Sequence, residues 1–107
     1  MIDWDRVAEL RDGIGEADFA EVVELFLEEA DEVVAGLASL DSAESRQAAL
    51  HFLKGSALNL GFQDLARLCQ QGEKAREMPP EALSGLIDCY RRSRDGFVTR
   101  LRAASAA

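Results

Sequence analysis

The fold is decided by residues 19–37, FAEVVELFLEEADEVVAGL, in which apolar side chains return every three or four positions. This is the period of one face of an α-helix, and acidic residues fill most of the remaining positions. The pattern predicts a long amphipathic helix over about residues 16–40 with one broad buried stripe. The stripe consists of Phe19, Val22, Val23, Phe26, Leu27, Ala30, Val33, Val34 and Leu37.

The same helical period recurs on both sides of this segment, and no strand-like alternation persists anywhere. Further helices are predicted over residues 4–11, from Ser42 to the Asn59-Leu60-Gly61 stop, and over residues 63–77 and 80–103. The residues that mark the helix ends are predicted from their types. They are Asp3 as the first N-cap, Gly13 and Gly15 as helix breakers, Asp41 and Ser42 as a turn and N-cap, Gly61 as a left-handed C-terminal stop, and Met78-Pro79-Pro80 as the end of one helix and the start of the last.

Short connections between long helices favour antiparallel neighbours. The sequence therefore predicts an all-α fold, an antiparallel up-down four-helix bundle with a short additional N-terminal helix. A chain of 107 residues that is 48% hydrophobic and 30% charged is expected to form one folded domain over residues 1–107. It has neither an apolar run long enough to span a membrane nor a signal peptide, so no membrane association and a cytoplasmic location are expected.

The net charge of −8 argues against nucleic-acid binding, which requires a basic surface. Cys69 and Cys89 lie within apolar helical patterns, without CxxC spacing and without companion histidines. They are interpreted as reduced core cysteines, and no metal site is expected.

Residues 51–61, HFLKGSALNLG, contain the single histidine of the chain. At about 100° per residue, His51 points away from the helix stripe that is predicted to be buried. That stripe is formed by Leu50, Leu53, Ala57 and Leu60, and the neighbours of His51 on the outer face are Gln47, Lys54, Gly55 and Leu58. An imidazole with an ammonium group one turn away, beside a residue without a side chain, suits an accessible nucleophile.

Three residues of this helix, Phe52, Ser56 and Asn59, lie between the predicted core and the His51 face. Phe52 is interpreted as a packing residue. Ser56 and Asn59 are expected to form hydrogen bonds at the helix end or between helices.

The spacing His51-x-x-Lys54-Gly55, followed by Gly61, resembles the histidine phosphotransfer (HPt) domain of multistep two-component phosphorelays. Ser56, Asn59-Leu60-Gly61, Leu65-Ala66-x-Leu68-Cys69 and the acidic segment of residues 19–40 also resemble this family. The resemblance therefore extends over nearly the whole chain. It implies a phosphorelay intermediate, which accepts a phosphoryl group on His51 from a receiver-domain aspartate and passes it to another response-regulator aspartate.

The chemistry of the residues agrees with this implication. A neutral imidazole is a nucleophile near pH 7 and can hold a phosphoryl group as a phosphoramidate. Lys54 is placed to neutralise phosphoryl oxygens, and its charge is expected to disfavour the imidazolium form of His51. In the family, the missing side chain of Gly55 lets a receiver domain approach, and Leu58 and Gln47 are expected to contact the same partner.

The family often has a glutamine on the following helix, at the position that aligns with Glu73. This chain departs from that pattern, and the acidic side chain argues against a direct contact between Glu73 and the phosphoryl group.

The expected partners are receiver domains of hybrid histidine kinases and response regulators, with the chain acting as a monomer. Mg²⁺ is expected on the receiver domain, and no cofactor is expected here. No nucleotide-binding motif is present, so the chain is predicted to be a phosphocarrier without kinase activity, and not an enzyme.

Alternatives remain open. The chain could be the phosphoacceptor module of a larger chemotaxis-type or hybrid kinase, or a non-catalytic helical adaptor in which His51 is incidental. A metal-dependent enzyme is a distant third.

The charge distribution also has two interpretations, because residues 1–50 carry 14 acidic and 3 basic side chains and residues 51–107 carry 6 acidic and 9 basic ones. It reflects either a solvated acidic helix face or a His51 half kept free of negative charge to receive a phosphoryl group.

Overall fold

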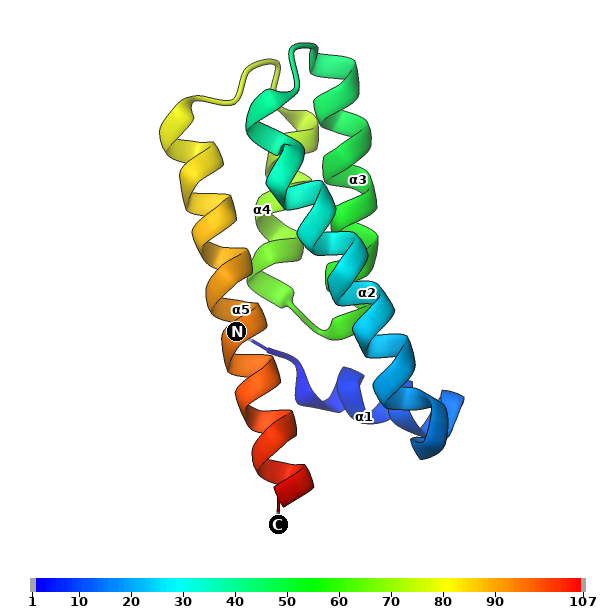
Figure 1. The fold of residues 1–107 in the computed structure, drawn as a ribbon. Helices are drawn as coiled ribbons and strands as arrows, with labels where there is room; N and C mark the ends of the chain where they lie inside the picture. Colours follow the sequence, from blue (N-terminus) through cyan, green and yellow to red (C-terminus); the bar gives the residue numbers. More distant parts are fainter. Residues whose placement is uncertain (1, 107) are drawn as a thin grey trace.

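The computed structural model describes residues 2–106, whose regular structure is helical apart from an isolated bridge between Ile2 and Phe62. The helices are α1 (Trp4–Ile14), α2 (Glu16–Gly36), α3 (Ala43–Leu60), α4 (Gln63–Lys74) and α5 (Pro80–Ala106), with a 3₁₀ turn η1 (Leu37–Ser39) after α2. Helices α2 to α5 lie side by side along the molecule, and α1 lies across one end (Figure 1). The predicted all-α class is confirmed. No helix within the described residues combines the length and apolarity needed to cross a membrane.

Local sequence sets both ends of α3, the helix that carries His51. At its start, the Ser42 hydroxyl accepts a hydrogen bond from the backbone N–H of Ser45 at 3.0 Å. At its end, Gly61 adopts a left-handed conformation with φ of 77°, and its N–H donates to the carbonyl of Ala57. Only glycine adopts this conformation without steric cost. The predicted cap and stop are therefore confirmed.

Four helix ends differ from the prediction. Helix α1 continues through Gly13, because one glycine inside a helix costs only about 1 kcal/mol. Helix α2 is α-helical to Gly36 and then tightens into η1. Helix α4 ends at Lys74, before the predicted Glu77, and Ala75 has an extended backbone. Helix α5 continues to Ala106, beyond the predicted residue 103.

The core lies along the inner faces of the helices. Both cysteines are buried and free within it, as predicted, and burial raises the pKa of the Cys69 thiol to about 12. The thiol of Cys69 is therefore protonated at neutral pH. The largest fully buried side chains are Phe62, Phe97, Leu50, Leu53, Leu60, Leu65, Leu86, Val7 and Cys69.

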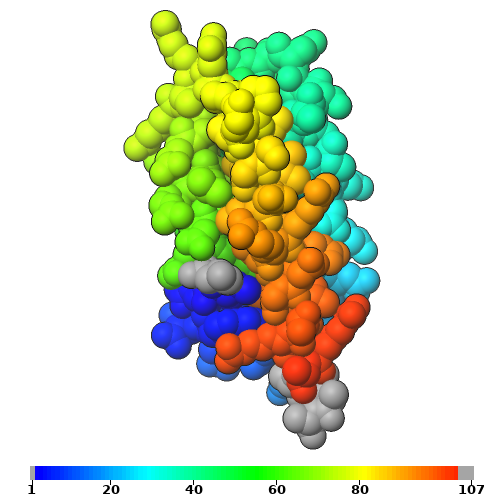
Figure 2. Space-filling model, turned by 90° about the vertical axis from the view of Figure 1, so that its left-hand side faces the viewer, coloured from blue at the N-terminus to red at the C-terminus, as the bar shows by residue number. Residues whose placement is uncertain are grey.

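Helix α1 is attached both to the end of α3 and to α5. The backbone N–H of Asp3 donates to the carbonyl of Gly61 at 2.7 Å. The Trp4 ring stacks on Phe97 with centroids 5.6 Å apart, and the Arg100 guanidinium lies 4.3 Å from the Trp4 ring centroid. Figure 2 shows the first residues of the chain (blue) below α4 and beside the C-terminal half of α5 (orange). These contacts close one end of the helical core.

Candidate functional site

His51 lies on the outer face of α3, and its side chain is 76% exposed. Leu50 and Leu53, one and two residues from it in the sequence, are completely buried. The helical period thus separates the imidazole from the core, as the sequence predicted. The ring is open to molecules that approach α3 from solvent.

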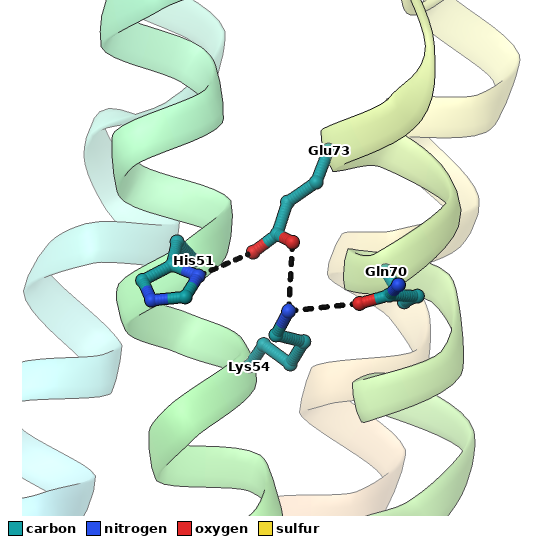
Figure 3. A network of polar contacts seen from close by, with 4 residues as sticks. All are labelled: His51, Lys54, Gln70 and Glu73. Atoms are coloured by element: carbon teal, nitrogen blue, oxygen red, sulfur yellow. Dashed lines mark hydrogen bonds and ion pairs between the residues drawn. The ribbon is translucent and has the colours of Figure 1, made fainter.

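Glu73, in the last turn of α4, reaches across to the imidazole (Figure 3). Its Oε1 lies 3.1 Å from Nδ1 of His51. An ionised carboxylate only accepts hydrogen bonds, so Nδ1 must carry the proton in this contact. In the neutral ring the lone pair is then on Nε2. The contact with Glu73 therefore selects Nε2 as the nucleophilic atom.

Lys54 is bound by two residues of α4. Its Nζ donates to Oε2 of Glu73 at 2.7 Å and to Oε1 of Gln70 at 2.8 Å, and its side chain is only 20% exposed. The carboxylate of Glu73 pairs with the charge of Lys54, and the predicted effect of Lys54 on the imidazole stays a prediction. An ammonium group has three N–H donors, so one remains for a further acceptor.

The same contacts determine the ionisation of Glu73. The hydrogen bond from Lys54 lowers the pKa of Glu73, and the hydrogen bond from His51 and the charge of Lys54 act in the same direction. Burial opposes them, since the Glu73 side chain is 17% exposed. The carboxylate is therefore ionised at neutral pH.

A glycine allows α3 and α4 to approach closely beside the site. Gly72 is buried, and a Cβ added there would lie 2.7 Å from Cδ1 of Leu50. Gly72 and Leu50 directly precede Glu73 and His51 in the chain. The close approach of the two helices therefore sets the separation of the carboxylate and the imidazole.

The residues expected to contact a partner surround His51 on the exposed side of α3. Gln47 and Gly55 are exposed, and a Cβ added at Gly55 would meet no atom within 4 Å. Leu58 is 56% exposed. These positions leave the approach to His51 open, and their contacts with a partner remain a prediction.

The three side chains between the core and this face differ in their surroundings. Phe52 is 42% exposed, so its interpretation as a packing residue is wrong. At about 100° around the helix from His51, its ring reaches only the edge of the bundle. The side-chain oxygen of Asn59 accepts from Arg6 at 3.2 Å, and this confirms the predicted hydrogen bond between helices. Ser56 is buried.

The sequence did not predict that Glu73 bonds to both His51 and Lys54, or that Gln70 bonds to Lys54. A usable signal was present, because two helices joined by a tight turn bring together residues at similar distances from it. His51 precedes Gly61 by 10 residues and Glu73 follows it by 12. The antiparallel pairing of the two helices thus predicts their contact, which helical periodicity alone does not.

Within residues 2–106, no group of three or more histidine, cysteine, aspartate or glutamate side chains is arranged to hold a metal ion.

The family model of the Hpt domain matches residues 21–103. No individual curated protein and no solved structure matches the chain significantly. The matched segment includes all of α3 and α4 and excludes α1. Hpt domains are the histidine phosphotransfer modules of phosphorelays, and they are phosphocarriers and not kinases. Because the match covers most of the chain, including the complete network around His51, this protein belongs to the Hpt domain family.

Proposed function

We propose that this chain is a phosphorelay intermediate. His51 accepts a phosphoryl group from the aspartyl phosphate of one receiver domain and passes it to an aspartate of another, in a response regulator. One observation carries the proposal, namely an exposed imidazole whose Nδ1 is bonded to Glu73, so that Nε2 faces solvent.

In the forward step, the Nε2 lone pair attacks phosphorus while the bond from phosphorus to the aspartate oxygen breaks. Such a transfer depends on alignment and on cations that neutralise the phosphoryl oxygens. The remaining N–H donor of Lys54, one helical turn from His51, is proposed to serve as one of them. Mg²⁺ bound to the acidic pocket of the receiver domain supplies the other positive charge.

The exposed face of α3 is the proposed docking surface for receiver domains of hybrid histidine kinases and response regulators. Gly55 leaves space beside His51 for the approaching aspartate, and Leu58 and Gln47 lie on the same face. We propose that the chain acts as a monomer. Its scaffold is an antiparallel up-down bundle of α2 to α5, because short connections join the helices that lie side by side.

The test is incubation of the protein with phosphorylated receiver domains, followed by transfer to a second receiver. Label on the wild type should be lost in acid and retained in base, as a phosphohistidine bond requires. The His51→Gln variant should remain folded, because the ring is exposed, and should carry no label. Label on His51→Gln would exclude His51 as the acceptor. Failure of every receiver to label the wild type would favour a non-catalytic adaptor.

A further inference from the structure

The contact between Glu73 and His51 places a negative charge where a neutral acceptor would suffice to orient the ring. Oε1 of Glu73 lies 3.1 Å from Nδ1, and the opposite oxygen is bonded to Lys54. An amide oxygen could accept the same Nδ1–H hydrogen bond. The additional effect of a carboxylate is electrostatic, because it favours the protonated state of the nitrogen that it contacts.

This effect matters most after phosphorylation. Once Nε2 is bonded to phosphorus, both ring nitrogens are substituted, and the Nδ1 proton is the one that the ring can release. If that proton is lost, cleavage of the P–N bond would have to expel an imidazolate anion. If it is retained, the leaving group is a neutral imidazole. The state of Nδ1 therefore decides how readily the phosphoryl group leaves.

We propose that Glu73 keeps Nδ1 of phosphorylated His51 protonated and so holds the phosphoryl group in the form that is passed on. The inference rests on the proposed function. In the transfer step, the P–Nε2 bond breaks and its electron pair returns to Nε2. A P–O bond forms to the receiver aspartate, and Nδ1 retains its proton. No proton enters or leaves the site in either direction.

The surroundings of Glu73 fit this role. Lys54 of α3 and Gln70 of α4 hold the carboxylate through Lys54 Nζ, and the buried Gly72 keeps the backbone of α4 close to α3. The charge of Lys54 opposes protonation of the ring, but Lys54 bonds to Glu73 whereas Glu73 bonds to the ring directly. Helix α2, which also packs on α3, contributes no hydrogen bond or ion pair to His51 or Glu73 among the described residues. Among the described side chains, the carboxylate of Glu73 is thus the charged group in direct contact with Nδ1.

The experiment uses the full chain phosphorylated chemically with phosphoramidate, so that the titration requires no receiver domain. Wild type, Glu73→Gln and Glu28→Gln are compared by ¹⁵N and ³¹P NMR as the pH is raised. Glutamine retains an oxygen acceptor for the Nδ1–H, and Glu28→Gln removes the same charge from an exposed position on α2. Phosphorylated Glu73→Gln should lose the Nδ1 proton about 1 pH unit lower than the wild type. Glu28→Gln should titrate like the wild type.

A second measurement follows the equilibrium between each phosphorylated variant and a receiver domain. Above the pH at which Glu73→Gln loses its Nδ1 proton, this variant should retain the phosphoryl group on His51 up to about tenfold more than the wild type. Identical titration curves for wild type and Glu73→Gln would overturn the inference and leave the proposed function standing. If neither phosphoramidate nor any receiver labels His51 in the wild type, both the proposed function and the inference fail.

Discussion

Glu73 connects the residues of the site, because its two carboxylate oxygens bind different partners. One accepts from His51 and the other from Lys54. A change at any one of the three residues therefore alters the environment of the other two. The effects of substitutions around His51 are therefore measured on both the transfer rate and the free energy of unfolding.

Replacement of Lys54 by alanine should slow phosphotransfer, because it removes a cation near the phosphoryl oxygens. It should also reduce the free energy of unfolding by about 1 kcal/mol, since a largely buried carboxylate loses one of its two partners. Single-turnover transfer and urea unfolding measure the two effects. Lys74→Ala, an exposed lysine beside Glu73, is the matched control and should change neither. Unchanged transfer by Lys54→Ala would show that Lys54 has only a structural role.

Replacement of Gly55 by glutamine should raise the stability and obstruct transfer. Glutamine is the better helix former by less than about 1 kcal/mol, and no atom lies within 4 Å of a Cβ added at Gly55. The new side chain would stand beside the attacking nitrogen, where the receiver must approach. A thermal melt and a transfer rate measure both effects on one variant. Gly96→Gln, at an equally open position of α5, should stabilise without slowing transfer. Normal transfer by Gly55→Gln would mean that the partner approaches from another side.

At the scale of elements, the packing of α3 against α4 determines the geometry of the site. Gly72→Ala should destabilise the protein by about 1–3 kcal/mol although alanine is the better helix former, because the new methyl group would overlap Cδ1 of Leu50. Leu50→Val removes that atom, so the double variant should be more stable than the sum of the two single changes implies. Urea unfolding of the four proteins measures this coupling. Strictly additive costs would show that α4 shifts freely along α3.

The pairing of these helices should also depend on pH. The pKa of Glu73 is lowered in the folded protein, chiefly by the hydrogen bond from Lys54. The pair therefore contributes stability above the unfolded pKa of about 4.3, and this contribution is lost as the pH falls through the lower folded pKa. The melting temperatures of wild type and Glu73→Gln should differ at neutral pH and converge below about pH 4. A difference that persists in acid would mean that shape, and not charge, distinguishes the two side chains.

The sequence predicted the helices and the exposure of His51 because both depend on local periodicity. It missed the partners of Lys54, since bonds between helices depend on how the chain turns at Gly61. It interpreted Phe52 as a packing residue at the edge of the core, because an apolar side chain at the edge of a stripe has the same sequence pattern whether it is covered or not. The continuation of α1 through Gly13 was also missed, because the cost of one glycine, about 1 kcal/mol, does not by itself end a helix.

At the scale of the whole molecule, α1 connects the beginning of the chain to the end of α5. Trp4→Ala should reduce the free energy of unfolding by about 2 kcal/mol, because the half-buried ring stacks on Phe97 and underlies Arg100. Trp4→Phe should lose less, since it retains a stacked ring. Chemical denaturation followed by circular dichroism measures both. Equal losses for the two variants would mean that the stacking adds nothing beyond the size of the side chain.

The stacking of Trp4 on Phe97 has a practical consequence. Trp4 is the only tryptophan of the chain, so its emission on selective excitation comes from one place, where α1 meets α5. Detachment of α1 would transfer the indole from an aromatic and cationic environment into water and shift its fluorescence to the red. The chain thus contains an intrinsic optical reporter of the junction of its two ends, which can be recorded while chemistry proceeds at the imidazole.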